Sequence, residues 1–117
     1  MNKKEKGLLG EKLAEKFLVK RGYKILNKNL KLGRLGEIDI LCCKQNFLNI
    51  VEVKSLFNSK SFLPEIHFNG RKMKKLKNLA NIILRKHPNF ENCIISLVCL
   101  SFEKQKVKIR YYENITL

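Results

Sequence analysis

Two strand-like segments that follow each other closely constrain this chain more than any other feature. Residues 36–41 (GEIDIL) and 50–54 (IVEVK) set charged residues among aliphatic ones in alternation. Side chains alternate between the two faces of a strand, so we expect the charges on one face. Glu and Lys are rarely buried unless they are paired or bound to a metal, which makes charges within such apolar strands informative. The opposite face would carry Ile38, Ile40, Val51 and Val53.

A hairpin that turns at residues 44–47 sets both segments in one register. Asp39 then lies opposite Glu52, and Glu37 lies opposite Lys54. Two carboxylates directly across a strand pair repel each other, and a divalent cation between them would remove the repulsion. Two alternatives stay open: a solvated charge pair, which an E-x-K strand also fits, and a one-residue bulge that breaks the register.

The whole chain, residues 1–117, is long enough for one domain and too short for two. A hydrophobic fraction of 44% is typical of a folded globular protein. No apolar run approaches the roughly 18–20 residues of a membrane span, and the first residues resemble no signal peptide. We therefore expect a cytoplasmic protein that does not enter a membrane.

A large positive charge indicates a polyanionic partner. Lysine and arginine total 25 against 10 acidic residues, which gives a net charge of +15. Nucleic acid is the leading candidate because phosphate contacts supply most non-specific affinity. An anionic membrane surface is the weaker alternative, since no helix here pairs a basic face with a bulky aromatic one. Plain solubility is the third explanation of the charge.

The order of hydrophobic patterns predicts an α/β fold with a mixed central sheet flanked by helices. We expect helices over residues 4–21 and 71–86, and a loop over residues 55–69. Strands are expected over residues 23–29, 36–41, 50–54, 93–102 and 107–112, in the order αβββαββ. We interpret the four cysteines as reduced core residues because none forms a C-x-x-C pair: Cys42, Cys43, Cys93 and Cys99.

The first helix carries an apolar stripe and an acidic residue beside it. We expect Gly7 and Gly10 to mark a close approach to the sheet, because glycine within a helix is otherwise unfavourable. Glu11, at the edge of the stripe, would reach a site built on the sheet; an exposed glutamate favoured by the helix dipole is the alternative. The stripe consists of Leu9, Leu13, Ala14, Phe17 and Leu18.

The second helix begins with a cluster of cations, which the helix dipole disfavours at that end. Such a cluster is explained if an external anion binds there, as phosphates do at helix N-termini, or if it is simply a solvated lysine face. Lys31 and Arg34, in the turn before the hairpin, are further candidates for phosphate contact. The cluster consists of Arg71, Lys72, Lys74, Lys75 and Lys77, and the inward residues are Met73, Leu76, Leu79, Ala80 and Ile83.

Two carboxylates and a lysine are sufficient to hydrolyse a phosphodiester. Asp39 and Glu52 would hold Mg²⁺ or Mn²⁺, together with a main-chain carbonyl near Val53 and water molecules. The metal would polarise the phosphate and lower the pKa of an attacking water. Lys54 would orient that water and offset charge that develops on the phosphate, and Glu11 would bind a second metal or a metal-bound water.

The spaced motifs of this chain resemble the YraN-like family of uncharacterised bacterial proteins. These motifs include Gly10-Glu11-x-x-Ala14, residues 36–39 (GEID) and residues 51–54 (VEVK), and they extend from Gly7 to about Ala80. The resemblance implies a restriction-endonuclease-like fold and the PD-(D/E)xK motif that Holliday-junction resolvases also contain. By this likeness Asp39, Glu52 and Lys54 match the catalytic motif, Glu11 matches the glutamate of the first helix, and Glu37 is an accessory position.

The sequence therefore predicts a metal-dependent endonuclease that acts on nucleic acid, with DNA favoured over RNA. Branched, flapped or single-stranded DNA is the expected substrate, and the resolvase-like resemblance is compatible with a homodimer. One alternative is a catalytically inert nucleic-acid-binding module with a nuclease fold, and another is an RNA- or ribosome-associated protein with structural carboxylates. We interpret His67 and His87 as structural or exposed residues.

Overall fold

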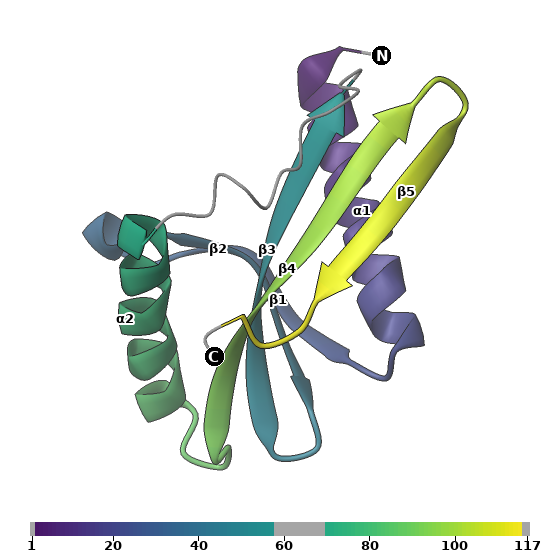
Figure 1. The fold of residues 1–117 in the computed structure, drawn as a ribbon. Helices are drawn as coiled ribbons and strands as arrows, with labels where there is room; N and C mark the ends of the chain where they lie inside the picture. Colours follow the sequence, from purple (N-terminus) through teal and green to yellow (C-terminus); the bar gives the residue numbers. More distant parts are fainter. Residues whose placement is uncertain (1, 58–69, 116–117) are drawn as a thin grey trace.

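The computed structural model describes residues 2–57 and 70–115, which fold in the predicted order αβββαββ (Figure 1). The chain enters the first helix through a cap, in which the Asn2 side chain accepts a hydrogen bond from the Glu5 N–H at 2.8 Å. No helix in these two ranges is long and apolar enough to cross a membrane. The helices are α1 (Lys3–Lys20), the 3-10 helix η1 (Gly33–Leu35) and α2 (Gly70–Lys86), and the strands are β1 (Lys24–Lys31), β2 (Glu37–Lys44), β3 (Phe47–Phe57), β4 (Asn92–Glu103) and β5 (Lys106–Tyr112).

The five strands form one sheet in the order β1-β2-β3-β4-β5. β3 and β4 run parallel, from Phe47 opposite Asn92 to Phe57 opposite Phe102, whereas the other neighbouring pairs are antiparallel. A parallel pair requires a crossover connection, and α2 lies within it. The predicted α/β class with a mixed sheet is confirmed.

The central strand β3 is longer than the sequence predicted. Residues 48–52 are all buried, as expected of a strand covered on both faces. Pairing with β4 continues to Phe57, whose ring stacks on Phe102 with ring centroids 5.0 Å apart. The loop expected from Ser55 is therefore wrong for residues 55–57, because parallel pairing overrides the weak local pattern, and residues 58–69 of that loop lie outside the described part of the chain.

Helices α1 and α2 cover opposite faces of the sheet, so the protein has two apolar layers (Figure 1). The inward residues predicted for α2 all lie in the layer on its side. β3 contributes to both layers, because Leu48 and Ile50 pack toward α2 and Val51 packs toward α1. The α2 layer also contains Ile38, Leu41 and Ile95, and the α1 layer contains Ala14, Leu18, Ile40, Cys42, Val98 and Leu100.

Two predictions about side-chain placement need correction. Ile38 does not share a layer with Ile40; it packs on the α2 side, where β2 no longer pairs with β3. Gly10 does mark a close approach of α1 to β3, since a Cβ atom there would lie 2.5 Å from the Ser55 Oγ. A Cβ atom on Gly7 would meet nothing within 4 Å among the described residues, so no close approach explains that glycine.

The four cysteines are free thiols, as the sequence predicted. Cys42 packs in the α1 layer and Cys43 against the α2 layer, which places these neighbours on opposite faces of β2. Burial raises the pKa of the Cys42 and Cys93 thiols to about 12, so both remain protonated at neutral pH. The cysteines therefore serve as small apolar residues of the two layers.

Substitution of Gly36, which joins η1 to β2, is expected to destabilise the protein. Its φ of +132° and ψ of −167° lie in a region that only glycine populates freely. Gly36→Ala should lower the free energy of unfolding by about 1–3 kcal/mol. The control Gly7→Ala, in an open helical position, should raise it by about 0.5–1 kcal/mol. Urea denaturation of both variants tests this, and equal changes in the two would contradict it.

Candidate active site

The strands β2 and β3 separate at Asp39. Their pairing follows the predicted register from Lys44 opposite Phe47 to Ile40 opposite Val51, and it ends there. One residue beyond, the Asp39 Oδ2 accepts a hydrogen bond from the Val53 N–H at 2.9 Å. The Asp39 carboxylate thus accepts the Val53 N–H where the ladder between β2 and β3 has ended, and this hydrogen bond fixes the carboxylate next to Glu52.

Asp39 and Glu52, here called the carboxylate pair, influence each other electrostatically. Glu52 is only 6% exposed and is one of the few buried polar or charged residues of the described structure. Burial and, next, the charge of Glu52 raise the pKa of Asp39 from 3.8 to about 7, against the opposing effect of the Val53 hydrogen bond. Two carboxylates held together in this way favour either a shared proton or a cation.

Lys72 of α2 provides a positive charge at the carboxylate pair. Its Nζ lies 2.7 Å from the Glu52 Oε2. Burial alone would lower the pKa of Lys72, but the hydrogen bond to Glu52, contact with Lys54 and the charges of the carboxylate pair raise it. The pKa of Lys54 is lowered, first by burial and then by contact with Lys72 and its charge, and the carboxylates offset only part of this. Both lysines therefore belong to the same electrostatic cluster as Asp39 and Glu52.

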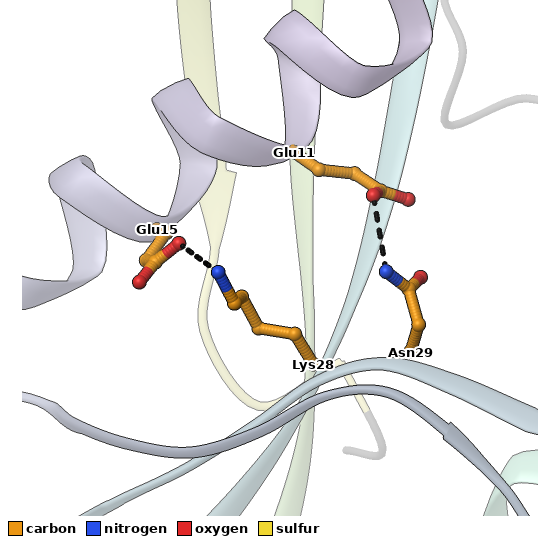
Figure 2. A network of polar contacts seen from close by, with 4 residues as sticks. All are labelled: Glu11, Glu15, Lys28 and Asn29. Carbon is orange, nitrogen blue, oxygen red and sulfur yellow. Dashed lines mark hydrogen bonds and ion pairs between the residues drawn. The ribbon is translucent and has the colours of Figure 1, made fainter.

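Glu11 lies at the periphery of this cluster. Its Oε1 accepts a hydrogen bond from the Asn29 Nδ2 at 3.4 Å, and the neighbouring Glu15 forms an ion pair with Lys28 at 3.1 Å (Figure 2). The charge of Glu11 still contributes to the raised pKa of Asp39. Within residues 2–57 and 70–115, no three His, Cys, Asp or Glu side chains gather closely enough to hold a metal ion together. The structure thus brings Asp39, Glu52 and Lys54 together and directs Glu11 toward Asn29.

The predicted pairing of Glu37 with Lys54 is wrong. Glu37 lies opposite Lys31 in the β1–β2 ladder, and its side chain is exposed. The reason is that β2 follows β1 rather than β3 beyond Ile40, a separation that the alternation of residues does not reveal.

The two basic segments that the sequence indicated separately meet in space. A pocket of about 350 Å³, here called the basic pocket, lies between η1 and α2. Arg34 lines it from η1, and Arg71, Lys74 and Lys75 line it from α2. Lys75 crosses over Gly36, because a Cβ atom on Gly36 would lie 2.7 Å from the Lys75 Cε. Lys72 faces Glu52 instead, and Lys31 lies opposite Glu37.

The role of Lys72 as a partner of Glu52 was not predicted from the sequence, although a signal existed. Lys72 is four residues before Leu76, in the same helical stripe as Leu79 and Ile83, which are buried. A lysine in an inward stripe requires an acidic partner on the sheet. His87 is structural, as predicted, with its Nδ1 2.9 Å from the Ile83 carbonyl oxygen, and His67 lies outside the described residues.

Comparison with known sequences places the chain among relatives of similar length. The profile of UPF0102, described as an uncharacterised protein family, matches residues 10–109. The chain belongs to the UPF0102 family. This confirms the YraN-like resemblance that the motifs indicated.

Individual UPF0102 proteins align over most of this chain. The protein of Natranaerobius thermophilus is 44% identical over 90 residues, which cover 77% of this chain and 76% of that protein. The proteins of Syntrophomonas wolfei and Clostridioides difficile are 37% and 41% identical and cover at least 95% of both chains. Among solved structures, Pyrococcus furiosus SfsA in complex with Ca²⁺ aligns with a TM-score of 0.44 at 18% identity, over 96% of this chain and 64% of that protein.

The donor atoms at the carboxylate pair suit a hard divalent cation. Mg²⁺ is commonly bound through one or two carboxylates, with water completing its coordination shell. Asp39 and Glu52 offer two carboxylates of this kind, and their mutual repulsion, seen in the raised pKa of Asp39, would decrease if a cation bound. Lys72 contacts the Glu52 Oε2, so a cation would bind the other oxygen, Oε1, or displace the lysine.

The raised pKa of Asp39 makes the stability of this UPF0102 chain pH-dependent. Between about pH 4 and pH 7 the folded protein holds a proton on Asp39 that the unfolded chain has released, so stability falls as pH rises. Asp39→Asn removes this ionisation and still accepts the Val53 hydrogen bond. We expect the variant to gain roughly 1–3 kcal/mol relative to wild type between about pH 5 and pH 8. Urea denaturation in EDTA measures the gain, and a pH-independent difference would contradict it.

Proposed function

We propose that this UPF0102 protein is a metal-dependent nuclease that hydrolyses phosphodiester bonds, with DNA as the favoured substrate. One observation carries the proposal: the Asp39 carboxylate is held by the Val53 N–H beside the buried Glu52, and Lys54 follows two residues after Glu52 on the same strand. The motif matches that of the PD-(D/E)xK nucleases, which the family resemblance implies. A carboxylate that is half-buried beside a buried one does not help the chain to fold, because their repulsion lowers stability, and a role in function explains the pair better.

Each side chain has a distinct part in the proposed reaction. A bound Mg²⁺ or Mn²⁺ supplies Lewis-acid polarisation of the scissile phosphate and a more acidic attacking water. Asp39 and Glu52 bind and orient the ion, and the Val53 N–H fixes the direction of the Asp39 carboxylate. Lys54, which belongs to the same electrostatic cluster, would orient the attacking water and offset negative charge that develops on the phosphate oxygens. Glu11 accepts a hydrogen bond from Asn29 and does not gather with Asp39 and Glu52 into a three-ligand group among the described residues, so it would hold a metal-bound water.

The distribution of charge supports nucleic acid as the substrate. The net charge of +15 favours polyanions, and the basic pocket lies on α2, the helix that also brings Lys72 to Glu52. Phosphate contacts from this helix would therefore place a nucleic-acid backbone near the carboxylate pair.

A second candidate function is a nucleic-acid-binding module without catalysis. The ion pair between Lys72 and Glu52 favours it, because at 2.7 Å the lysine already neutralises Glu52 without a metal. In that case the carboxylates and lysines would be a buried structural network, and the basic pocket would be the functional surface.

Cleavage assays test the nuclease proposal directly. Labelled duplex, flap, four-way-junction and single-stranded DNA, and RNA, would be incubated with the protein in Mg²⁺ or Mn²⁺. We expect wild type to cleave at least one substrate and Asp39→Ala or Lys54→Ala to lose at least about 100-fold in rate, as for removal of other electrostatic catalytic groups.

Glu103→Gln, purified in parallel, controls for contaminating nucleases, because Glu103 is exposed at the end of β4. It should retain the wild-type rate. Binding without product in wild type, or equal product from wild type and Asp39→Ala, would favour the non-catalytic module.

Metal binding is also expected to appear as thermal stabilisation. A ligand that binds only the folded state raises the melting temperature, so Mg²⁺ or Mn²⁺ in the millimolar range should stabilise wild type. Asp39→Ala should lose this increase, whereas Glu103→Gln should keep it. Equal increases in wild type and Asp39→Ala, measured by differential scanning fluorimetry, would show that the cation binds elsewhere.

A further inference from the structure

The basic pocket combines two chemical surfaces that the charge of the protein alone does not explain. The cations that line it, here called the rim, are Arg34, Arg71, Lys74 and Lys75. The apolar residues that line it, here called the floor, are Leu35, Leu79 and Ile82. A volume of about 350 Å³ lies within the range of about 300–1,000 Å³ that ligand pockets occupy. A site for phosphate alone would need the rim and not the floor.

The rim cations are available for a ligand. Within residues 2–57 and 70–115, none of the four forms an ion pair with a carboxylate. Other pockets of the protein differ in this respect: the one between α1 and β1 is lined by Glu5, Glu11 and Glu15. Among residues 2–57 and 70–115, no acidic side chain lines the basic pocket, so the described residues present a positive field to an anion.

Leu35 has no evident structural role in its observed position. It is 52% exposed, whereas Leu79, which also lines the pocket, is 1% exposed and belongs to the α2 layer. η1 holds Leu35 beside α2, so that an apolar surface opens to solvent among four cations. Exposed apolar surface ringed by polar groups is typical of binding sites.

We propose that the basic pocket binds one unpaired nucleotide, with the base on the accessible surface of Leu35 and Ile82 and the phosphates on the rim cations. Asn78, which also lines the pocket, offers an amide that hydrogen-bonds to base edges. A base stacked and paired within a duplex cannot reach the floor, so the pocket selects nucleic acid with a single-stranded end, flap or gap.

This inference deepens the proposed function, because it defines which substrates reach the carboxylate pair. Lys72 and the pocket residues Arg71 and Lys74 are adjacent along α2 but point to different sides of the helix. A nucleotide in the pocket would therefore anchor the strand within about one helical turn of Glu52. Binding to the pocket does not need the metal or the reaction, so the two proposals can fail separately.

Fluorescence anisotropy in EDTA tests the pocket without cleavage. The probes are oligothymidylate and oligouridylate of about 12 nucleotides, and a blunt DNA hairpin with a similar number of phosphates. Leu35→Ala should weaken binding of a single-stranded probe about fivefold and leave hairpin binding within about twofold. The matched control is Leu8→Ala, because Leu8 is 56% exposed on α1, and it should change neither.

The rim is tested by the dependence of binding on salt. Arg71→Gln should reduce the slope of log affinity against log salt concentration for single strands by about 0.7. Lys106→Gln, which removes the same charge from β5, should reduce it less. Weaker binding of either single-stranded probe to Leu35→Ala would support the pocket. Whether oligothymidylate or oligouridylate binds with higher affinity would show whether DNA or RNA is preferred.

Two results would overturn the inference: equal effects of Leu35→Ala and Leu8→Ala, or an equal loss of affinity on hairpin and single strands. If Leu35 dependence is found but no substrate is cleaved, the pocket stands and the nuclease proposal fails. If cleavage depends on Asp39 but binding does not depend on Leu35, the nuclease stands and the pocket fails.

Discussion

The parallel pairing of β3 with β4 determines the position of almost everything else in this protein. Two parallel neighbours cannot be joined by a tight turn, so the chain must cross one face of the sheet, and α2 lies in that crossover. The helix therefore starts near the end of β3 that carries Glu52 and Lys54. Without the parallel pair, Lys72 would not meet Glu52, and η1 would have no helix against which to form a pocket.

A charged group in the middle of a buried strand must be compensated locally. Glu52 is surrounded by the apolar residues of β3, and Lys72 offsets its charge from the helix above. Asp39 is compensated differently, by the amide of Val53, which lies beyond the last paired residues of β2 and β3. The Asp39 side chain thus stabilises the point at which the two strands separate. The same hydrogen bond fixes the orientation of the Asp39 carboxylate.

The sequence predicted the class, order and inward faces of the elements because burial imposes simple periods on helices and strands. It predicted the register of the β2–β3 hairpin from the turn, and hence the meeting of Asp39 and Glu52. It failed for Ile38, Glu37 and residues 55–57, where pairing with β1 or β4 decides the outcome. The basic pocket was also missed as a unit, because η1 and α2 are distant in sequence and only the tertiary fold joins them.

Two sides of α2 carry separate tasks. One side fills the apolar layer through Leu76 and Ile83, and the same stripe brings Lys72 to Glu52 one turn earlier, whereas the other side holds the cations of the basic pocket. Because 100° of rotation separates consecutive residues, neighbouring substitutions on this helix affect different properties. α2 is accordingly the element in which a genetic screen would recover separation-of-function alleles, with stability, carboxylate chemistry and ligand affinity lost independently at adjacent codons.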